Sequence, residues 1–308
     1  MPVRTIRAGS SIREYVWSLW IVNRYEALLA YNVGYFCIVA AVGLYVGLDT
    51  SWLPLFGVLF GAVITMKSQA SIADALHDYE ADRANPEKSY VSRSVDAIGE
   101  EAARTLLVSQ LLLSMFLWGT LTHATGDPFY LAAGAVACFF GYTYSYPPRF
   151  KERGFLNHLV TSGVDVTCVL LPGLVLLTGE SLATFLPILL VVFWYSLAFH
   201  VMHQAGDTYR DRQASMSTFT GSVGVSNAVL ASAAFLALAA AVAAYARYPL
   251  IATVCIGYGA YFLFVYRWSR GEPSKRKSKI VSRAFSVARC ASVLNVAFAL
   301  DFLVRVVV

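Results

Sequence analysis

Long apolar runs separated by short polar stretches dominate the pattern of hydrophobic and polar positions along this chain. An α-helix rises about 1.5 Å per residue, so about 20 apolar residues cross the roughly 30 Å hydrocarbon core of a bilayer. The long runs have about this length. The pattern predicts nine membrane-spanning helices, at residues 25–48, 54–75, 103–122, 128–146, 156–178, 182–205, 225–246, 249–267 and 284–307.

The composition agrees with a membrane protein. Of the 308 residues, 57% are hydrophobic and 14% are charged, whereas a soluble domain carries about 25% charged residues. No polar stretch is long enough to fold separately, so we expect one all-α, polytopic transmembrane domain over residues 1–308. The first apolar run is too long for a signal peptide and lacks a small-residue cleavage site, so no cleavable signal is expected. The five cysteines lie in apolar stretches without CxxC spacing and are expected to pack in the core.

The placement of positive charge predicts the orientation in the membrane. Lys and Arg gather on one side if the N-terminus lies in the cytoplasm, as the positive-inside rule requires. The residues that depart from this distribution are Lys67, Arg247, Arg289 and Arg305. The N-terminal segment, residues 1–24, mixes basic with aromatic residues and is expected to lie along the membrane interface.

An acidic sequence follows the second predicted helix. Asp74, Asp78 and Asp82 are spaced four apart, which places three carboxylates on one face of a helix. Divalent cations or protons are needed to hold such like charges together, and hard oxygen ligands suit Mg²⁺. Lys67 lies on the same face, where it either pairs with these carboxylates or contacts an anionic ligand. We therefore interpret this helix end as a metal site.

A second acidic sequence ends the sixth predicted helix. His203, Asp207 and Asp211 repeat the four-residue spacing. The histidine raises the alternative of zinc, but zinc prefers nitrogen and sulfur ligands, and two groups of carboxylates favour Mg²⁺.

Two further charged positions lie inside predicted helices. Asp165 needs a partner or a proton that the sequence does not reveal, and Asp301 with Arg305, four apart, predicts an ion pair within one helix.

Taken together, these residues resemble the UbiA superfamily of intramembrane prenyltransferases. The first motif of that superfamily, two acidic positions four apart followed by Arg and Asn-Pro, is matched by Asp78, Asp82, Arg83, Asn85 and Pro86, with Asp74 where the family usually has Asn. The second motif is matched by Asp207, Asp211, Thr218 and Gly224. An intervening Tyr-Ser-x-Pro-Pro-x-x-Lys segment is matched by Tyr144, Ser145, Pro147, Pro148 and Lys151. The sequence departs from the family at Lys88–Val91 and at Ser215.

The resemblance implies a bundle of nine transmembrane helices around a central cavity, with both acidic motifs at the cytoplasmic face. It also implies Mg²⁺ as cofactor and an isoprenyl diphosphate as substrate. The implied catalytic residues are Asp78, Asp82, Asp207 and Asp211, and Asp74 joins them as a metal ligand. The implied diphosphate-binding residues are Lys67, Lys88, Arg149 and Lys151. The pocket for the allylic cation would be lined by Tyr142, Tyr146, Trp194, Tyr195 and His203, because aromatic faces stabilise cations.

Two reactions are consistent with these features. The first is transfer of the prenyl group to an aromatic or lipid acceptor in the membrane, and the alternative is a terpene cyclase that needs no acceptor. A transporter or cation channel is a third hypothesis, and it predicts ionisable residues near the bilayer midplane rather than at helix ends. The expected partners are membrane lipids and the diphosphate substrate, without nucleic acid.

Overall fold

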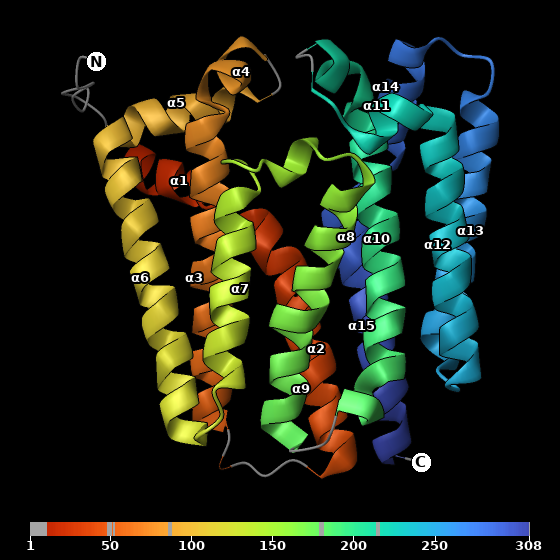
Figure 1. The fold of residues 1–308 in the computed structure, drawn as a ribbon. Helices are drawn as coiled ribbons and strands as arrows, with labels where there is room; N and C mark the ends of the chain where they lie inside the picture. The colour runs from red at the N-terminus through yellow and green to blue at the C-terminus, as the bar shows by residue number, and fades with distance from the viewer. Residues whose placement is uncertain are drawn as a thin grey trace. The chain divides into compact units, whose positions relative to one another are not determined.

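The chain folds into helices throughout the part that the structure describes. In the computed structural model, the described residues are 11–47, 51, 53–85, 88–178, 182–213 and 216–307. No strand occurs among them apart from a single bridge between Gly154 and Thr218. The expected all-α class is therefore confirmed (Figure 1). The elements are α1 Ile12–Val22, α2 Tyr25–Val46, α3 Leu53–His77, α4 Tyr79–Ala84, α5 Ser89–Ile98, α6 Glu100–Thr125, α7 Phe129–Thr143, η2 Phe150–Glu152, α8 Phe155–Val164, η3 Asp165–Leu170, α9 Leu171–Thr178, α10 Leu182–Gln213, α11 Phe219–Val223, α12 Val225–Tyr245, α13 Pro249–Ser269, α14 Ser274–Ala284 and α15 Val287–Val307.

Seven helices among the described residues are long and apolar enough to cross a membrane. Two shorter apolar helices, Tyr31–Val46 and Phe129–Thr143, lie where the first and fourth spans were predicted. The predicted count of nine is therefore not confirmed. The fourth helix is shorter than its prediction because α7 gives way to a loop before Pro147 and Pro148, which lack the amide hydrogen that a helix needs.

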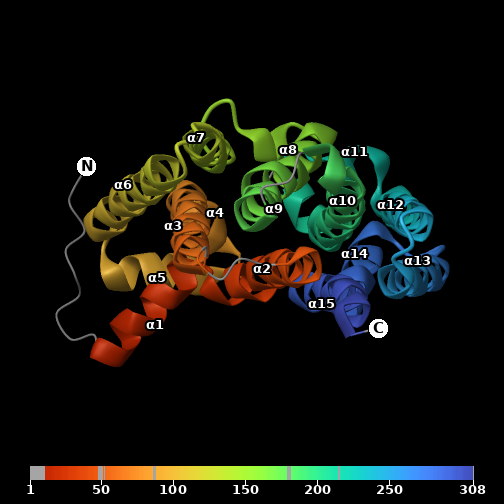
Figure 2. The same ribbon diagram turned by 90° about the horizontal axis from the view of Figure 1, so that it is seen from below.

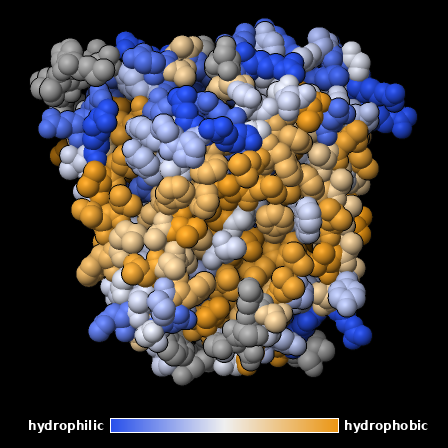
Figure 3. Space-filling model, in the orientation of Figure 1, coloured by the Kyte–Doolittle hydropathy of each residue, from blue (hydrophilic) through white to orange (hydrophobic). Residues whose placement is uncertain are grey.

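Apolar side chains cover the middle of the helices and polar ones their ends. Figure 3 shows this distribution on one face, with hydrophobic residues between two hydrophilic zones. Such a surface suits helices whose middle sections contact hydrocarbon and whose ends contact water. It agrees with an integral membrane protein.

The chain forms two compact units, which are described separately. The first comprises residues 1–29 and 54–150. Within it α1 packs on α5, α5 on α4 and α6, and α6 on α7. Its helix ends enclose an apolar cluster of Val22, Ile72, Ala75, Val91, Val95, Ile98 and Ala103. Deeper along α6 and α7, Trp118 lies against Gly134, where a Cβ atom would come within 2.3 Å of the indole Cγ. Only glycine allows this close approach.

Residues 1–10 of the N-terminal segment lie outside the described residues, and its interfacial location stays a prediction. Ser11 caps the helix by accepting the Glu14 amide hydrogen bond at 3.2 Å. Ile12 and Trp17 are exposed, and Val22 is buried. The helix therefore carries apolar side chains on its outer as well as its inner face.

The second unit comprises residues 30–53 and 151–308. Here α10 packs on α12 and α14, α12 on α13, and α13 on α15; Figure 2 shows these helices side by side and nearly end-on. Asn295 on α15 lies against Gly34 on α2, where a Cβ atom would come within 2.5 Å of the amide nitrogen. The predicted span at 156–178 consists of three consecutive segments, α8, the π-helical η3 and α9.

The predicted ion pair between Asp301 and Arg305 is wrong. Both oxygens of Asp301 accept backbone hydrogen bonds from the first turn of α13, from Leu250 at 3.0 Å and Ile251 at 2.8 Å. Arg305 donates to the Arg247 carbonyl, and its guanidinium lies 4.8 Å from the centre of the Tyr248 ring. The unpaired amides at a helix start are stronger competitors for the carboxylate than a neighbour on its own helix.

Candidate active site

The first acidic sequence lies across a break between two helices of the first unit. α3 ends at His77 and α4 begins at Tyr79, with Asp78 between them at φ −90° and ψ 9°. The amides of Asp78 and Asp82 still bond to the carbonyls four residues earlier, each at 2.8 Å. The four-residue repeat is thus kept, but the prediction that one continuous helix carries all three carboxylates is wrong.

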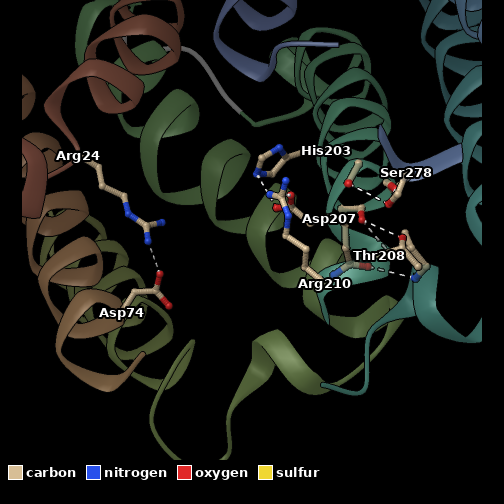
Figure 4. Close-up of polar contacts among 11 residues, drawn as sticks. Arg24, Asp74, His203, Asp207, Thr208, Arg210 and Ser278 are labelled. Atoms are coloured by element: carbon tan, nitrogen blue, oxygen red, sulfur yellow. Dashed lines mark hydrogen bonds and ion pairs between the residues drawn. The ribbon is translucent and has the colours of Figure 1, made fainter. Parts of the chain in front are cut away.

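Asp74 joins three segments of the first unit. Its Oδ2 lies 2.6 Å from Nη2 of Arg24, which comes from the turn between α1 and α2 (Figure 4). Its Oδ1 accepts a hydrogen bond of 2.7 Å from Ser145, which follows α7. The Asp74 carboxylate raises the pKa of Arg24 above its usual value. Arg24 was not among the predicted site residues; the signal available in the sequence was its position beside the start of the first apolar run.

Asp82 is buried without a complete set of partners. The residue is 6% exposed, and its Oδ2 has no hydrogen-bond partner among the described residues. Burial raises the pKa of the Asp82 carboxyl to about 6, against the opposing effect of the Lys88 and Arg24 charges. A buried carboxylate oxygen in this state is stabilised by a proton or by a cation. Asp82 therefore fits the role of a ligand to a hard divalent cation.

A chain of three polar side chains leads from Arg149 to Asp78. Arg149 Nη2 lies 2.7 Å from His77 Nε2, and His77 Nδ1 lies 2.9 Å from Asp78 Oδ1. Arginine can only donate, so Nε2 accepts and the imidazole proton resides on Nδ1, from which it is donated to Asp78. The His77 ring also packs edge-on against Tyr146, which stacks on the exposed Tyr142 at 4.7 Å. The first unit thus brings together the predicted residues Asp78, Arg149, Tyr142 and Tyr146 through His77, which was not predicted.

The second acidic sequence is on one uninterrupted helix, as predicted. α10 continues through His203, Asp207 and Asp211 to Gln213. His203 Nε2 lies 3.8 Å from Asp207 Oδ2, and Arg210 Nη1 lies 3.9 Å from Asp207 Oδ1 (Figure 4). His203 is largely exposed and Asp207 is half-buried.

Hydrogen bonds to other helices hold this end of α10 in place. The Thr208 hydroxyl donates to the Thr220 hydroxyl at 2.8 Å, which fixes α10 to α11. The Ser278 hydroxyl of α14 donates to the Gly206 carbonyl at 2.9 Å. The acidic side chains therefore project from a backbone that is held on two sides.

The other predicted residues lie in varied surroundings. Lys67 and Lys88 are half-buried in the first unit, and Lys151 is buried in η2 of the second. Trp194 stacks on Phe235 with ring centres 5.8 Å apart. The fully buried Tyr195 donates to Asn295 Oδ1 at 2.5 Å.

Among the residues that the structure describes, no group of three or more His, Cys, Asp or Glu side chains is arranged to hold a metal ion. The carboxylates of the two motifs belong to different units. The donors themselves suit Mg²⁺, which in phosphate-binding sites takes one or two carboxylates, substrate phosphate oxygens and water. The metal-binding assignment of the five aspartates stays a prediction.

Apolar helices long enough to cross a membrane, with charged side chains at their ends, define a polytopic integral membrane protein. The family is then given by the sequence. The model of the UbiA prenyltransferase family matches residues 34–288, so the chain belongs to this family and is an enzyme of the prenyltransferase type.

Individual relatives share part of the sequence and most of the fold. A lycopene elongase/hydratase from Corynebacterium glutamicum is 26% identical over 230 residues, which cover 72% of this chain and 71% of the relative. A UbiA homologue from Archaeoglobus fulgidus, solved with GPP and Mg²⁺, superposes with a TM-score of 0.69 at 18% identity, covering 94% of this chain and all of the other. The apo structure of a homologue from Aeropyrum pernix gives a TM-score of 0.64 at 19% identity, covering 88% of this chain and 96% of the other. The structural likenesses establish the fold.

Proposed function

We propose that this prenyltransferase ionises an isoprenyl diphosphate in a Mg²⁺-dependent reaction and transfers the prenyl group to an acceptor inside the membrane. The main support is the buried Asp82 oxygen that lacks a hydrogen-bond partner among the described residues. The A. fulgidus homologue supports it further, since it was solved with Mg²⁺ and either GPP or DMAPP. The positive-inside distribution of Lys and Arg supports a site that faces the cytoplasm.

The residues of the two acidic sequences have separate tasks in this proposal. Asp78, Asp82, Asp207 and Asp211 hold the cations, and Asp74 positions the end of α3 through Arg24 and Ser145. Bound Mg²⁺ would neutralise the negative charge that develops on the departing diphosphate.

The cationic side chains bind the diphosphate itself. Arg149 is oriented by His77, and a guanidinium group is well suited to bind phosphate oxygens. Lys67, Lys88 and Lys151 supply the remaining positive charge. The aromatic faces of Tyr142, Tyr146 and Trp194 stabilise the allylic cation once the diphosphate has left.

We propose an acyclic polyene of the lycopene type as the acceptor. This follows from the two C. glutamicum relatives, which are both named lycopene elongase/hydratase. A terminal double bond of a polyene is electron-rich and reacts directly with an allylic cation, and a polyene dissolves in the apolar environment of membrane-spanning helices. Elongation and hydration are then two results of one attack, because the cation formed on the acceptor either loses a proton or adds water.

The test uses the full-length protein in lipid nanodiscs that contain lycopene. DMAPP or GPP is added with Mg²⁺, released diphosphate is measured, and lipid-soluble products are identified by mass spectrometry. We expect diphosphate release and a prenylated polyene, both lost on addition of EDTA. A cyclic terpene formed without acceptor would instead establish the cyclase alternative, and the absence of diphosphate release from every allylic substrate would contradict the proposal.

Variants test the metal-binding residues in the same assay. Asp78→Asn and Asp211→Asn keep the side-chain shape and remove the charge, and we expect each to lower turnover at least about 100-fold because charge stabilisation is lost. Unchanged melting temperatures without Mg²⁺ serve as the folding control. Wild-type turnover in both variants would remove the metal assignment.

A further inference from the structure

A carboxylate is buried in the middle of a membrane-spanning segment of the second unit. Asp165 has 0% exposure and begins the π-helical turn η3 within the apolar segment Phe155–Thr178. Ionisable groups at such a depth are costly and are retained mainly for function. π-Helical turns also concentrate at functional sites because they redirect a side chain from the regular helix pattern. The two features coincide at Asp165.

Two side chains from other helices of the unit contact this carboxylate. The Tyr35 hydroxyl of α2 donates to Asp165 Oδ2 at 3.4 Å, and Nε2 of His200 on α10 lies 3.5 Å from the same oxygen. Tyr35 is fully buried, whereas the His200 side chain is 18% exposed. His200 therefore links the buried carboxyl group of Asp165 to a partly exposed side chain on α10.

The position of His200 on α10 relates it to the second acidic motif. It precedes Asp207 by seven residues, which is close to two helical turns, so both residues lie on the same face about 10 Å apart along the axis. Asp207 is near the end of the helix, and His200 is deeper in the apolar part. An acceptor that dissolves in the membrane would react at this depth.

The tautomer assigned to His200 rests on its contact with Asp165. An ionised carboxylate accepts the Nε2 proton, which leaves the lone pair on Nδ1. Nδ1 accepts no hydrogen bond from any described residue. The pair therefore has the arrangement of an oriented general base, in which the carboxylate fixes the tautomer and stabilises the imidazolium that forms.

We propose that His200, positioned by Asp165, is the base that completes the transfer reaction by quenching the cation left on the acceptor. This inference rests on the proposed function. The bond between C1 of the prenyl group and the diphosphate oxygen breaks, and diphosphate leaves with the electron pair. The acceptor double bond supplies the pair for the new carbon–carbon bond, which leaves a tertiary cation on the acceptor.

The final step gives one of two products, depending on which molecule His200 deprotonates. Removal of a proton from the carbon next to the cation gives an alkene, and removal from a water whose oxygen bonds to the cation gives a tertiary alcohol. In both cases His200 Nδ1 takes the proton and later releases it to solvent. Ser162, one turn before Asp165, has a buried hydroxyl without a hydrogen-bond partner among the described residues, and such groups usually bind ordered water.

The experiment measures the yield of prenylated polyene per diphosphate released, in nanodiscs with Mg²⁺, DMAPP and lycopene. For His200→Gln we expect this yield to fall about 100-fold, the range of general base catalysis, with diphosphate release within about threefold of wild type. Without the base, the new carbon–carbon bond reopens; water then adds to the regenerated dimethylallyl cation and loses a proton to solvent, which gives dimethylallyl alcohol instead. For Asp165→Asn we expect the same direction and a smaller fall of about 10-fold, because the base remains and only its orientation and charge stabilisation are lost.

Two further variants separate a catalytic from a structural effect. His158→Gln is the matched control, because His158 is also buried in this unit but bonds to Gln204 at 3.1 Å rather than to Asp165; its yield per diphosphate should equal that of wild type. Tyr35→Phe removes only the hydroxyl that donates to Asp165 and should lower the yield about threefold, which keeps the test open if the Asp165 variant does not fold.

The outcomes distinguish this inference from the function beneath it. A wild-type yield in His200→Gln would overturn the inference while leaving prenyl transfer intact, and so would equal yield losses in the His200 and His158 variants. Failure of the wild-type enzyme to release diphosphate would remove the proposed function itself, and the inference with it.

Discussion

Single side chains in the first unit carry more than one interaction, and Asp74 shows the consequence for stability. Removal of Arg24 would take away the positive charge that faces the mostly buried Asp74 carboxylate, while the hydrogen bond from Ser145 at 2.7 Å would stay. We expect Arg24→Gln to lower the free energy of unfolding by about 1–3 kcal/mol, less than for a fully buried pair because the Arg24 side chain is 41% exposed. Thermal melting in detergent measures this change.

Arg104→Gln is the matched control for that variant. Arg104 pairs with Glu100 at 2.8 Å on the surface of α6, where both side chains are well exposed. Exposed ion pairs contribute about 0–1 kcal/mol, so the melting temperature should hardly change. Equal effects of the two substitutions would contradict the anchoring role of Arg24.

Asp82 makes stability depend on pH. Its folded-state pKa of about 6 lies above the unfolded value of 3.8, so its contribution to stability is fully present below pH 3.8 and is lost as the pH rises through 6. Without divalent cations, Asp82→Asn should remove this loss and stabilise the protein at pH 7.5 by at most about 3 kcal/mol. Melting curves of both proteins between pH 4 and 8 in EDTA test this; parallel curves would contradict it.

The sequence identified most of the charged residues but not their partners. Asp165 was recognisable as a buried carboxylate, yet nothing in the spacing pointed to Tyr35 or His200, which are 130 and 35 residues away. The same holds for Arg24, which is 50 residues from Asp74. Periodicity relates positions within one helix, whereas these contacts depend on how separate helices pack.

At the scale of elements, close packing of α6 on α7 depends on a missing side chain. Gly134→Ala would place a Cβ atom 2.3 Å from Trp118 Cγ, so we expect a loss of about 1–3 kcal/mol as the ring or helix shifts. Gly119→Ala, on α6 with nothing within 4 Å of the new atom, should stabilise the helix by up to about 1 kcal/mol. The melting temperature should fall for Gly134→Ala and rise for Gly119→Ala. A rise for Gly134→Ala would show that the contact between Gly134 and Trp118 is not tight.

The hydrophobic pattern predicted where helices lie better than where they change direction. The runs at 54–75 and 225–246 correspond closely to α3 and α12. The break at Asp78 and the π-helical turn at Asp165 have no counterpart in the apolar pattern, since hydropathy does not report backbone conformation. The paired prolines did predict the end of α7, because proline excludes regular helix for a local reason.

At the scale of the whole molecule, binding of substrate and metal should stabilise the fold. A ligand that binds only the folded state adds about 2.7 kcal/mol when present at 100 times its dissociation constant. We expect Mg²⁺ together with geranyl S-thiolodiphosphate to raise the melting temperature, and EDTA to remove the increase. Asp82→Asn should show a smaller rise. Full stabilisation by the diphosphate analogue in EDTA would contradict the metal-binding proposal.

The fold class and the family were accessible from the sequence because both depend on long-range patterns: apolar segments of bilayer length and motifs in a fixed order. The number of spans was not accessible from the sequence. The apolar part of α2, Tyr31–Val46, and the whole of α7 are both shorter than the other membrane-spanning helices. The acceptor was not accessible either, because the motifs that bind the diphosphate are shared by reactions with different acceptors.

The carboxylate of Asp301 secures the beginning of a helix that starts about fifty residues earlier in the chain. During translation α13 is synthesised before Asp301. The hydrogen bonds from its first amides to Asp301 therefore form only after α15 has been made. Proteolysis or a premature stop codon near residue 300 would therefore loosen α13 as well as shorten α15. Such a product would expose two defects to membrane quality control: a loosened start of α13 and a shortened α15.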